Sequence, residues 1–291
     1  MNNRNKIFLL FVLIVTLMFL PACVPSEKPV LPQVSDYEFQ ESAQERKNLK
    51  LGIVAGPYGD LFLETIYPFL REKGYTVEII SYGDYVSPNV ALAGKMIDLN
   101  LSQHYRYLNN YNFANDVSLS AIAEVPTVSM GIYSLKYNSL YNLKKGLKVF
   151  VPSDGINFSR ALLLLEAANL IKLNPNINKY KATSNSIMEN PYQMEFVPTS
   201  PNLLAASLPD ADLAVINGNY AFSSGLKSSA ALYNERQAED YFNIIVVRTE
   251  DLGEQFVKDI VAVTRLDDYK YTIRNSKYME FQLPRDFFST R

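Results

Sequence analysis

The segment LGIVAGPYGD, residues 51–60, decides the fold of this chain. Its first five residues form a short apolar run that is typical of a buried strand, and Gly56-Pro57 breaks the run. Asp60 can cap a following helix, in which apolar side chains recur at helical spacing until Gly74. A buried strand that leads through a glycine turn into a helix begins a βαβ unit, so the segment predicts an α/β protein.

The chain after this segment continues the same alternation. Residues 75–81 and 97–101 alternate as two more strands, and Pro88 begins a short helix between them that ends at Gly94. A β-α-β-α-β order predicts a parallel sheet with helices on both faces.

A second α/β unit begins at about residue 148. The sequence predicts its strands at 149–151, 212–216 and 241–247, and its helices at 158–173 and 251–265. The simplest architecture is two lobes with a cleft between them. Ligands of open α/β sheets bind at the carboxyl ends of strands, so binding residues are expected in the loops that follow these strands.

The N-terminus has the features of a secretion signal. Two basic residues precede an apolar run over residues 7–20, and LPAC follows at residues 20–23. This arrangement resembles a bacterial lipobox, whose cysteine is lipidated after the signal is removed; an uncleaved membrane anchor is the alternative. We therefore expect a signal peptide over 1–22 and a lipidated flexible tether over 23–47. The body would then be anchored to the cell membrane by lipid, palmitate included, on its periplasmic or cell-surface side.

Composition restricts the chemistry. Cleavage before Cys23 lowers Lys plus Arg from 28 to 26 against 30 Asp plus Glu, and a net charge near −4 disfavours a nucleic-acid partner. Cys23 is the single cysteine and His104 the single histidine, which is poor material for a metal site or a nucleophilic triad. The sequence holds no phosphate-binding glycine motif and no nucleophile elbow. We expect no enzyme, no metal and no cofactor, although paired Asp/Glu catalysis is not excluded by sequence.

Polar residues at helix starts and strand ends favour a binding protein. Asn157 and Arg160 lie three residues apart at the start of the apolar helix, where free N–H groups and a guanidinium suit a carboxylate. An exposed Arg160 that pairs with Asp154 is the alternative. Asn217 ends a strand, so its amide can bind an ammonium or a carboxylate group; a turn-forming asparagine before glycine is its alternative.

His104 and Tyr85, which have ring side chains, also lie at or just after the ends of predicted strands. His104 closes the third strand, where a neutral imidazole can contact a ligand, and Tyr85 follows the second strand, where it can form a cleft wall. A surface histidine and a core tyrosine are the respective alternatives.

Residues 49 to at least 249 resemble the NlpA lipoprotein family, whose best-known members are methionine-binding receptors of ABC importers. The resemblance rests on segments that occur in the family's order: GIVAGP (52–57), DYVSPN (84–89), QH (103–104) with YL (107–108), GIYS (131–134), VPSD (151–154) with Asn157, RALLLL (160–165), ENP (189–191), and AVIN (214–217) with YA (220–221).

The resemblance implies a two-lobed, type 2-like periplasmic-binding-protein fold with the ligand in the interlobe cleft. The first lobe would comprise residues 48–132 and 246–291, and the second residues 133–245. Crossing segments near 132–134 and 244–247 would form the hinge.

The resemblance also implies roles for the candidate residues. The arginine that matches Arg160 holds the ligand carboxylate, and the asparagines that match Asn157 and Asn217 hold its other backbone groups. The residues that match Tyr85 and His104 line the side-chain pocket. The implied function is a monomeric receptor that delivers methionine or a related amino acid to a separate membrane permease of an ABC importer.

Two positions depart from the family pattern. Ser102 stands where the family usually has an aromatic residue before Gln-His, and Val128 lies in a run where a bulkier pocket residue is often found. Each lost sulfur–aromatic contact weakens the hold on a thioether by about 0.3–1.5 kcal/mol. Another amino acid, a methionine derivative or a short peptide therefore stays open as the ligand, and a surface lipoprotein without a transport role stays open as the function.

Overall fold

The structure is a computed structural model that describes residues 46–288. The predicted signal peptide, Cys23 and nearly all of the predicted tether lie outside the described residues. The described residues belong to one compact unit, and within it they form two five-stranded sheets and one two-stranded sheet. Among them, no helix has the length and apolar character needed to cross a bilayer.

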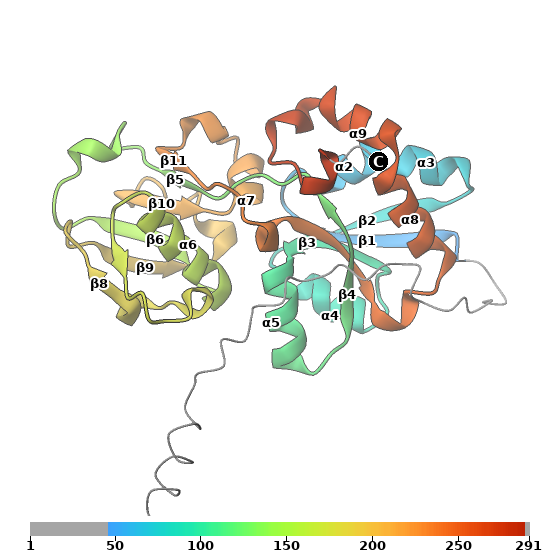
Figure 1. Cartoon of the computed structure of the whole chain (residues 1–291), viewed down its shortest axis with the longest axis horizontal. Helices are drawn as coiled ribbons and strands as arrows, with labels where there is room; N and C mark the ends of the chain where they lie inside the picture. Colours follow the sequence, from blue (N-terminus) through green and yellow to red (C-terminus); the bar gives the residue numbers. More distant parts are fainter. Residues whose placement is uncertain (1–45, 289–291) are drawn as a thin grey trace, which may run out of the picture. The chain divides into compact units, whose positions relative to one another are not determined.

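The first sheet has the strand order β2-β1-β3-β12-β4 (Figure 1). Its strands are β1 (Asn48–Val54), β2 (Thr76–Tyr82), β3 (Leu99–His104), β4 (Leu119–Val125) and β12 (Asn243–Arg248). β1 runs parallel to both β2 and β3, as the β-α-β-α-β pattern predicts. β12 comes from the far end of the chain and pairs antiparallel with β3 and β4, so the sheet is mixed rather than purely parallel.

Helices cover both faces of this sheet, as predicted. They are α2 (Tyr58–Thr65), α3 (Tyr67–Glu72), α4 (Ser87–Ala93), α5 (Tyr105–Asn115), α8 (Gln255–Arg265) and α9 (Asp267–Arg274). Successive side chains of β12 point to opposite faces of the sheet and so enter two cores. Ile245 and Val247 pack in the core with α2 and α8. Ile244 and Val246 pack in the core with α4 and α5.

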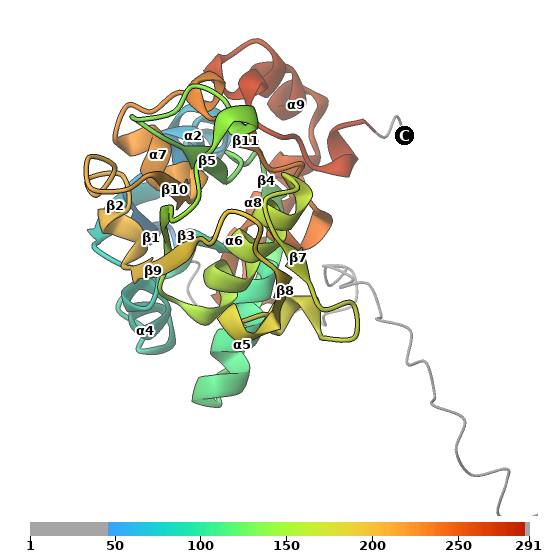
Figure 2. The same cartoon turned by 90° about the vertical axis from the view of Figure 1, so that its left-hand side faces the viewer.

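The second sheet has the order β11-β5-β10-β6-β9. Its strands are β5 (Gly131–Tyr133), β6 (Lys148–Pro152), β9 (Glu195–Thr199), β10 (Leu213–Ile216) and β11 (Tyr233–Asn234). Its helices are α6 (Gly155–Ala167) and α7 (Gly218–Ser223), and β7 (Lys172–Leu173) pairs with β8 (Ile187–Glu189) beside α6 (Figure 2). This sheet has its own core, in which Val149, Leu162 and Val215 are fully buried. The two predicted α/β units are therefore present, but the strand predicted over 241–247 and the helix predicted over 251–265 belong to the first sheet and its core, not to the second unit.

Two segments cross between the sheets. Residues 126–130 join β4 to β5, and residues 235–242 join β11 to β12. A backbone hydrogen bond from Glu235 N to Met130 O (2.9 Å) ties the segments together near the second sheet, and Asn243 N donates to Thr127 Oγ1 (2.8 Å) near the first. The two crossings thus precede β5 and β12, whereas the hinge segments predicted near 132–134 and 244–247 fall at the end of β5 and inside β12.

The bounds of several elements differ from the predicted ones. α2 begins at Tyr58 with Pro57 at its N-cap, so Asp60 lies in the first helical turn and is not the cap. The helix predicted over 158–173 is α6, which ends at Ala167 because Asn169 adopts a left-handed backbone (φ 58°). The apolar pattern runs on past that residue because Leu170 and Leu173 pack in the same core as α6.

The environment of Glu124 on β4 predicts that the stability of the fold depends on pH. Burial, together with the nearby Asp286, Glu239 and Asp240, raises the pKa of Glu124 from 4.5 to about 7. The folded state therefore favours the protonated acid, and this contribution to stability is present below pH 4.5 and lost as pH rises through 7. We expect Glu124→Gln to raise the free energy of unfolding at pH 8 by about 1–2 kcal/mol, after allowance for partial solvent screening.

Urea denaturation at pH 5 and pH 8 measures this effect. The gain in Glu124→Gln should be clearly smaller at pH 5, because folded Glu124 is then almost wholly protonated and buries no charge. Equal gains at the two pH values would contradict the raised pKa.

Candidate functional site

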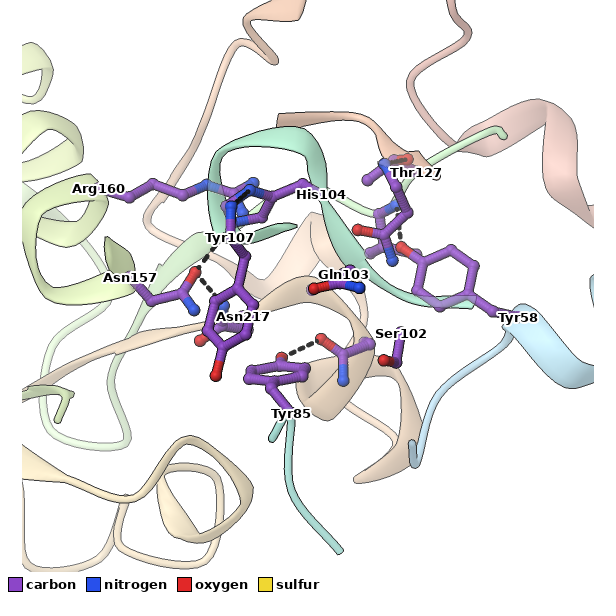
Figure 3. A pocket seen from close by; sticks show the side chains of 14 residues that line it. Tyr58, Tyr85, Ser102, Gln103, His104, Tyr107, Thr127, Asn157, Arg160 and Asn217 are labelled. Carbon is purple, nitrogen blue, oxygen red and sulfur yellow. Dashed lines mark hydrogen bonds between the residues drawn. The ribbon is translucent and has the colours of Figure 1, made fainter. Parts of the chain in front are cut away.

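A cavity lies where the loops of the two sheets meet, and polar side chains dominate its lining (Figure 3). The lining residues are Tyr58, Tyr85, Ser102, Gln103, His104, Tyr107, Thr127, Val128, Asn157, Arg160, Asn217, Gly218, Asn219 and Asn243. The cavity has a volume of about 20 Å³. That is room for one or two waters, so an amino acid enters only when the lining side chains or the lobes move apart.

The structure brings all five predicted ligand-binding residues to this cavity. Tyr85 follows β2, His104 ends β3, and Asn217 follows β10, while Asn157 and Arg160 lie in the first turns of α6. These elements converge because the carboxyl ends of parallel strands share one edge of each sheet.

Arg160 is buried and paired with a residue that sequence reasoning missed. Its side chain is 5% exposed, and its Nε and Nη2 donate to both carboxylate oxygens of Glu235, at 2.9 Å for Nε–Oε1 and 2.6 Å for Nη2–Oε2. Burial lowers the pKa of Arg160, but the Glu235 carboxylate more than offsets it and the pKa is raised, so the guanidinium stays charged. The alternative of an exposed arginine paired with Asp154 is wrong, because Asp154 instead caps α6 through Asn157 N (2.9 Å).

The imidazole of His104 is held neutral. Burial first, and then the positive charge of Arg160, hold the pKa of His104 well below 6.5. Its Nδ1 accepts from Tyr107 N (3.2 Å), so Nε2 carries the proton and faces Asn157 Oδ1 at 3.4 Å. With 4% exposure, His104 is a cavity residue, and the surface alternative is wrong.

Asn217 offers an acceptor without a partner. Its Nδ2 donates to Asn157 Oδ1 (2.9 Å), whereas its Oδ1 is buried and makes no hydrogen bond to any residue that the structure describes. An unmade bond at a buried acceptor costs about 1–3 kcal/mol, so this oxygen is suited to accept from a ligand N–H group.

Tyr85 lies on the cavity wall and helps to join the two sheets. Its hydroxyl donates to Asn219 Oδ1 (2.7 Å), and Asn219 Nδ2 donates to Ala55 O (2.9 Å). Asn219 is on α7 of the second sheet, while Tyr85 and Ala55 follow strands of the first. These bonds therefore hold the loops over the cavity together.

Residues of the second crossing segment also belong to the site. The Tyr241 ring lies 4.5 Å from the Arg160 guanidinium carbon and meets His104 edge-on at 5.0 Å between ring centroids. Glu235 follows β11, a two-residue strand that the sequence did not predict, and neither Glu235 nor Tyr241 belongs to a motif, so only their proximity to Arg160 in the folded chain identifies them. Within residues 46–288, no cluster of three or more His, Cys, Asp or Glu could hold a metal ion.

Known proteins resemble this chain over most of its length. The family model described as NlpA lipoprotein matches residues 49–285. "Outer membrane lipoprotein 3" of Mannheimia haemolytica is 34% identical over 76% of this chain and 84% of its own length. "D-methionine-binding lipoprotein MetQ" of Escherichia coli (strain K12) is 32% identical over 78% of this chain and 85% of its own length.

Solved structures of substrate-binding proteins are also similar to this chain in sequence and fold. An ABC transporter periplasmic substrate-binding protein from Coxiella burnetii is 36% identical, with a TM-score of 0.72 over 78% of this chain and 95% of that protein. A nutrient-binding protein from Burkholderia cenocepacia, bound to methionine, is 33% identical, with a TM-score of 0.73 over 78% of this chain and 95% of that one.

Proposed function

This chain belongs to the NlpA lipoprotein family, and on that premise we propose that it delivers methionine or a related amino acid to an ABC importer. It has the two-lobed α/β fold of periplasmic substrate-binding proteins, and it is a binding protein rather than an enzyme. The expectations from the resemblance on family, fold class and the absence of enzymatic function are thereby confirmed.

The observation that carries the proposed ligand class is that one cavity contains both the charged guanidinium of Arg160 and the unpartnered oxygen of Asn217. A charged guanidinium suits the carboxylate of an amino acid, and a buried carbonyl oxygen without a partner suits its ammonium group. Because Arg160 is already neutralised by Glu235 and His104 is uncharged, the site has no excess positive charge. It therefore favours a zwitterion over a simple anion.

Lobe closure completes the proposed mechanism. The lobes over 48–125 with 243–288 and over 131–234 would move about the crossing segments 126–130 and 235–242, and the polar bonds over the cavity would form on closing. A monomer in that closed form would dock on the permease. We further propose that lipidation of Cys23 keeps the chain on the extracytoplasmic side of the membrane, as the lipoprotein names of the relatives support.

Thermal unfolding against L-methionine, D-methionine and the other amino acids tests this function. The full chain in detergent would first be unfolded and refolded to remove carried-over ligand. A ligand that binds only the folded state stabilises it by about 2.7 kcal/mol at one hundred times its dissociation constant, which raises Tm by several degrees. A protein that no amino acid stabilises would instead be a surface lipoprotein without a transport role.

A further inference from the structure

The end of the cavity opposite Arg160 is lined by hydroxyl groups. Figure 3 shows Tyr58, Ser102 and Thr127 on one side of Gln103, and Arg160 with Asn157 on the other. We call Tyr58, Ser102 and Thr127 the hydroxyl end. A ligand whose backbone groups meet Arg160 and Asn217 would direct its side chain toward this end.

Two of these hydroxyls have already donated their protons to the protein. Ser102 Oγ donates to Asn100 Oδ1 (2.6 Å), and Thr127 Oγ1 donates to Val125 O (2.8 Å). A hydroxyl has one proton and two lone pairs, so these oxygens can offer a ligand only acceptor sites, and Thr127 offers just one because its oxygen already accepts from Asn243 N (2.8 Å). Tyr58 accepts from Val128 N (3.3 Å), and burial raises the pKa of Tyr58 to about 12, which keeps this group an uncharged hydroxyl.

A buried amide network fixes Ser102 in this orientation. Asn89 Nδ2 donates to Gln103 Oε1 (2.8 Å), Gln103 Nε2 donates back to Asn89 Oδ1 (2.6 Å), and Asn100 Nδ2 donates to the same oxygen (2.9 Å). All three amides are at most 2% exposed. Because Asn100 Nδ2 donates to this network, Asn100 Oδ1 stays oriented toward Ser102 and accepts its proton.

The hydroxyl end is also closely packed against the start of α7. A β-carbon on Gly218 would lie 2.2 Å from Val128 O, so the start of α7 is already in contact with the first crossing segment. Val128 is the single aliphatic side chain among the lining residues. A long apolar side chain would find little room, and it would leave acceptor oxygens without water or partner.

We propose that the ligand is an amino acid with a short side chain that ends in a hydrogen-bond donor, a hydroxyl or a carboxamide, and that Ser102 and Tyr58 select it. This inference rests on the proposed function and narrows its ligand from methionine to a related polar amino acid. A site built to hydrogen-bond a substrate group rejects the isostere that lacks it, because the buried partner is then unpaired.

Isosteric pairs of L-amino acids test the inference by titration calorimetry on the refolded full chain in detergent. Threonine and valine differ by a hydroxyl against a methyl, and asparagine and leucine by a carboxamide against an isopropyl group. We expect the polar member of at least one pair to bind about tenfold or more tightly than its apolar partner and than methionine. Methionine or the apolar members binding at least as tightly would overturn the inference and leave the receptor function intact.

Two conservative variants test whether Ser102 and Tyr58 produce the preference for a polar side chain. Ser102→Ala and Tyr58→Phe each remove one hydroxyl and keep the rest of the side chain. We expect each variant to reduce the polar preference about five- to tenfold while valine binding does not weaken. A polar preference that survives in both variants would overturn the assignment to these residues. Binding of no amino acid at all would overturn both the inference and the proposed function. The wild-type pairs decide the ligand class even if a variant fails to fold.

Discussion

Arg160→Ala is expected to weaken amino-acid binding by at least a hundredfold. A hydrogen bond to a charged group contributes about 1.5–3 kcal/mol, and the guanidinium can offer a ligand carboxylate two of them in a site that is 95% shielded from solvent. The loss of both contacts corresponds to about 3–6 kcal/mol, and each 1.4 kcal/mol is a factor of ten in the dissociation constant. Titration calorimetry with the ligand found by thermal unfolding measures the effect.

The control must separate lost binding from lost folding. Arg160→Ala leaves the Glu235 carboxylate buried without its partner, which costs about 3–5 kcal/mol of stability in comparable pairs. The double variant Arg160→Ala/Glu235→Ala removes both charges and should regain much of that stability. If the double variant folds and still binds no ligand, Arg160 contacts the ligand directly. Recovery of binding in the double variant would contradict that role.

The strand ends that carry the candidate residues could be predicted from sequence because their signals are local. Short apolar runs followed by Gly or Asn mark β1 and β10, an alternating run marks β3, and parallel strands must place their carboxyl ends at one edge. That rule places His104 and Asn217 at the carboxyl-end edges of their own sheets. It does not place the two sheets against one cavity; that expectation came from the simplest two-lobed architecture and from the resemblance.

The parts that could not be predicted depend on contacts between distant segments. β12 reads as a buried strand, but no local pattern tells that it inserts antiparallel between β3 and β4. Glu235 lies 75 residues from Arg160, so the sequence offered the nearby Asp154 as the partner instead. Asp154 was unavailable because helix capping already uses its carboxylate.

Tyr58 is a cavity residue that the sequence analysis did not single out. It follows the Gly56-Pro57 break after the first strand. The structure begins α2 at Tyr58 and buries the ring to 2% exposure, with the side chain at the cavity. No local pattern gives this placement, because it depends on where the first crossing segment passes.

Glu235→Gln is expected to change both stability and ligand selection. The substitution keeps the shape of the side chain and removes its charge, so Arg160 becomes a buried cation without a counterion. The free energy of unfolding should fall by about 3 kcal/mol, near the lower end for broken buried pairs. Small anions such as acetate should restore part of it, because they can take the place of the carboxylate; wild-type stability should not respond to acetate in this way.

Ligand selection in Glu235→Gln distinguishes an electrostatic role from a structural one. In the wild type, the paired charges leave the site without excess positive charge, and we expect the deaminated counterpart of the ligand to bind far more weakly than the amino acid. In Glu235→Gln the site is positive, so a plain carboxylate becomes a better match, and the ratio of the two affinities should narrow about tenfold or more. Calorimetry with both compounds on both proteins measures that ratio. A ratio that is unchanged in a folded variant would mean that Glu235 only holds Arg160 in position and does not set the charge that the site prefers.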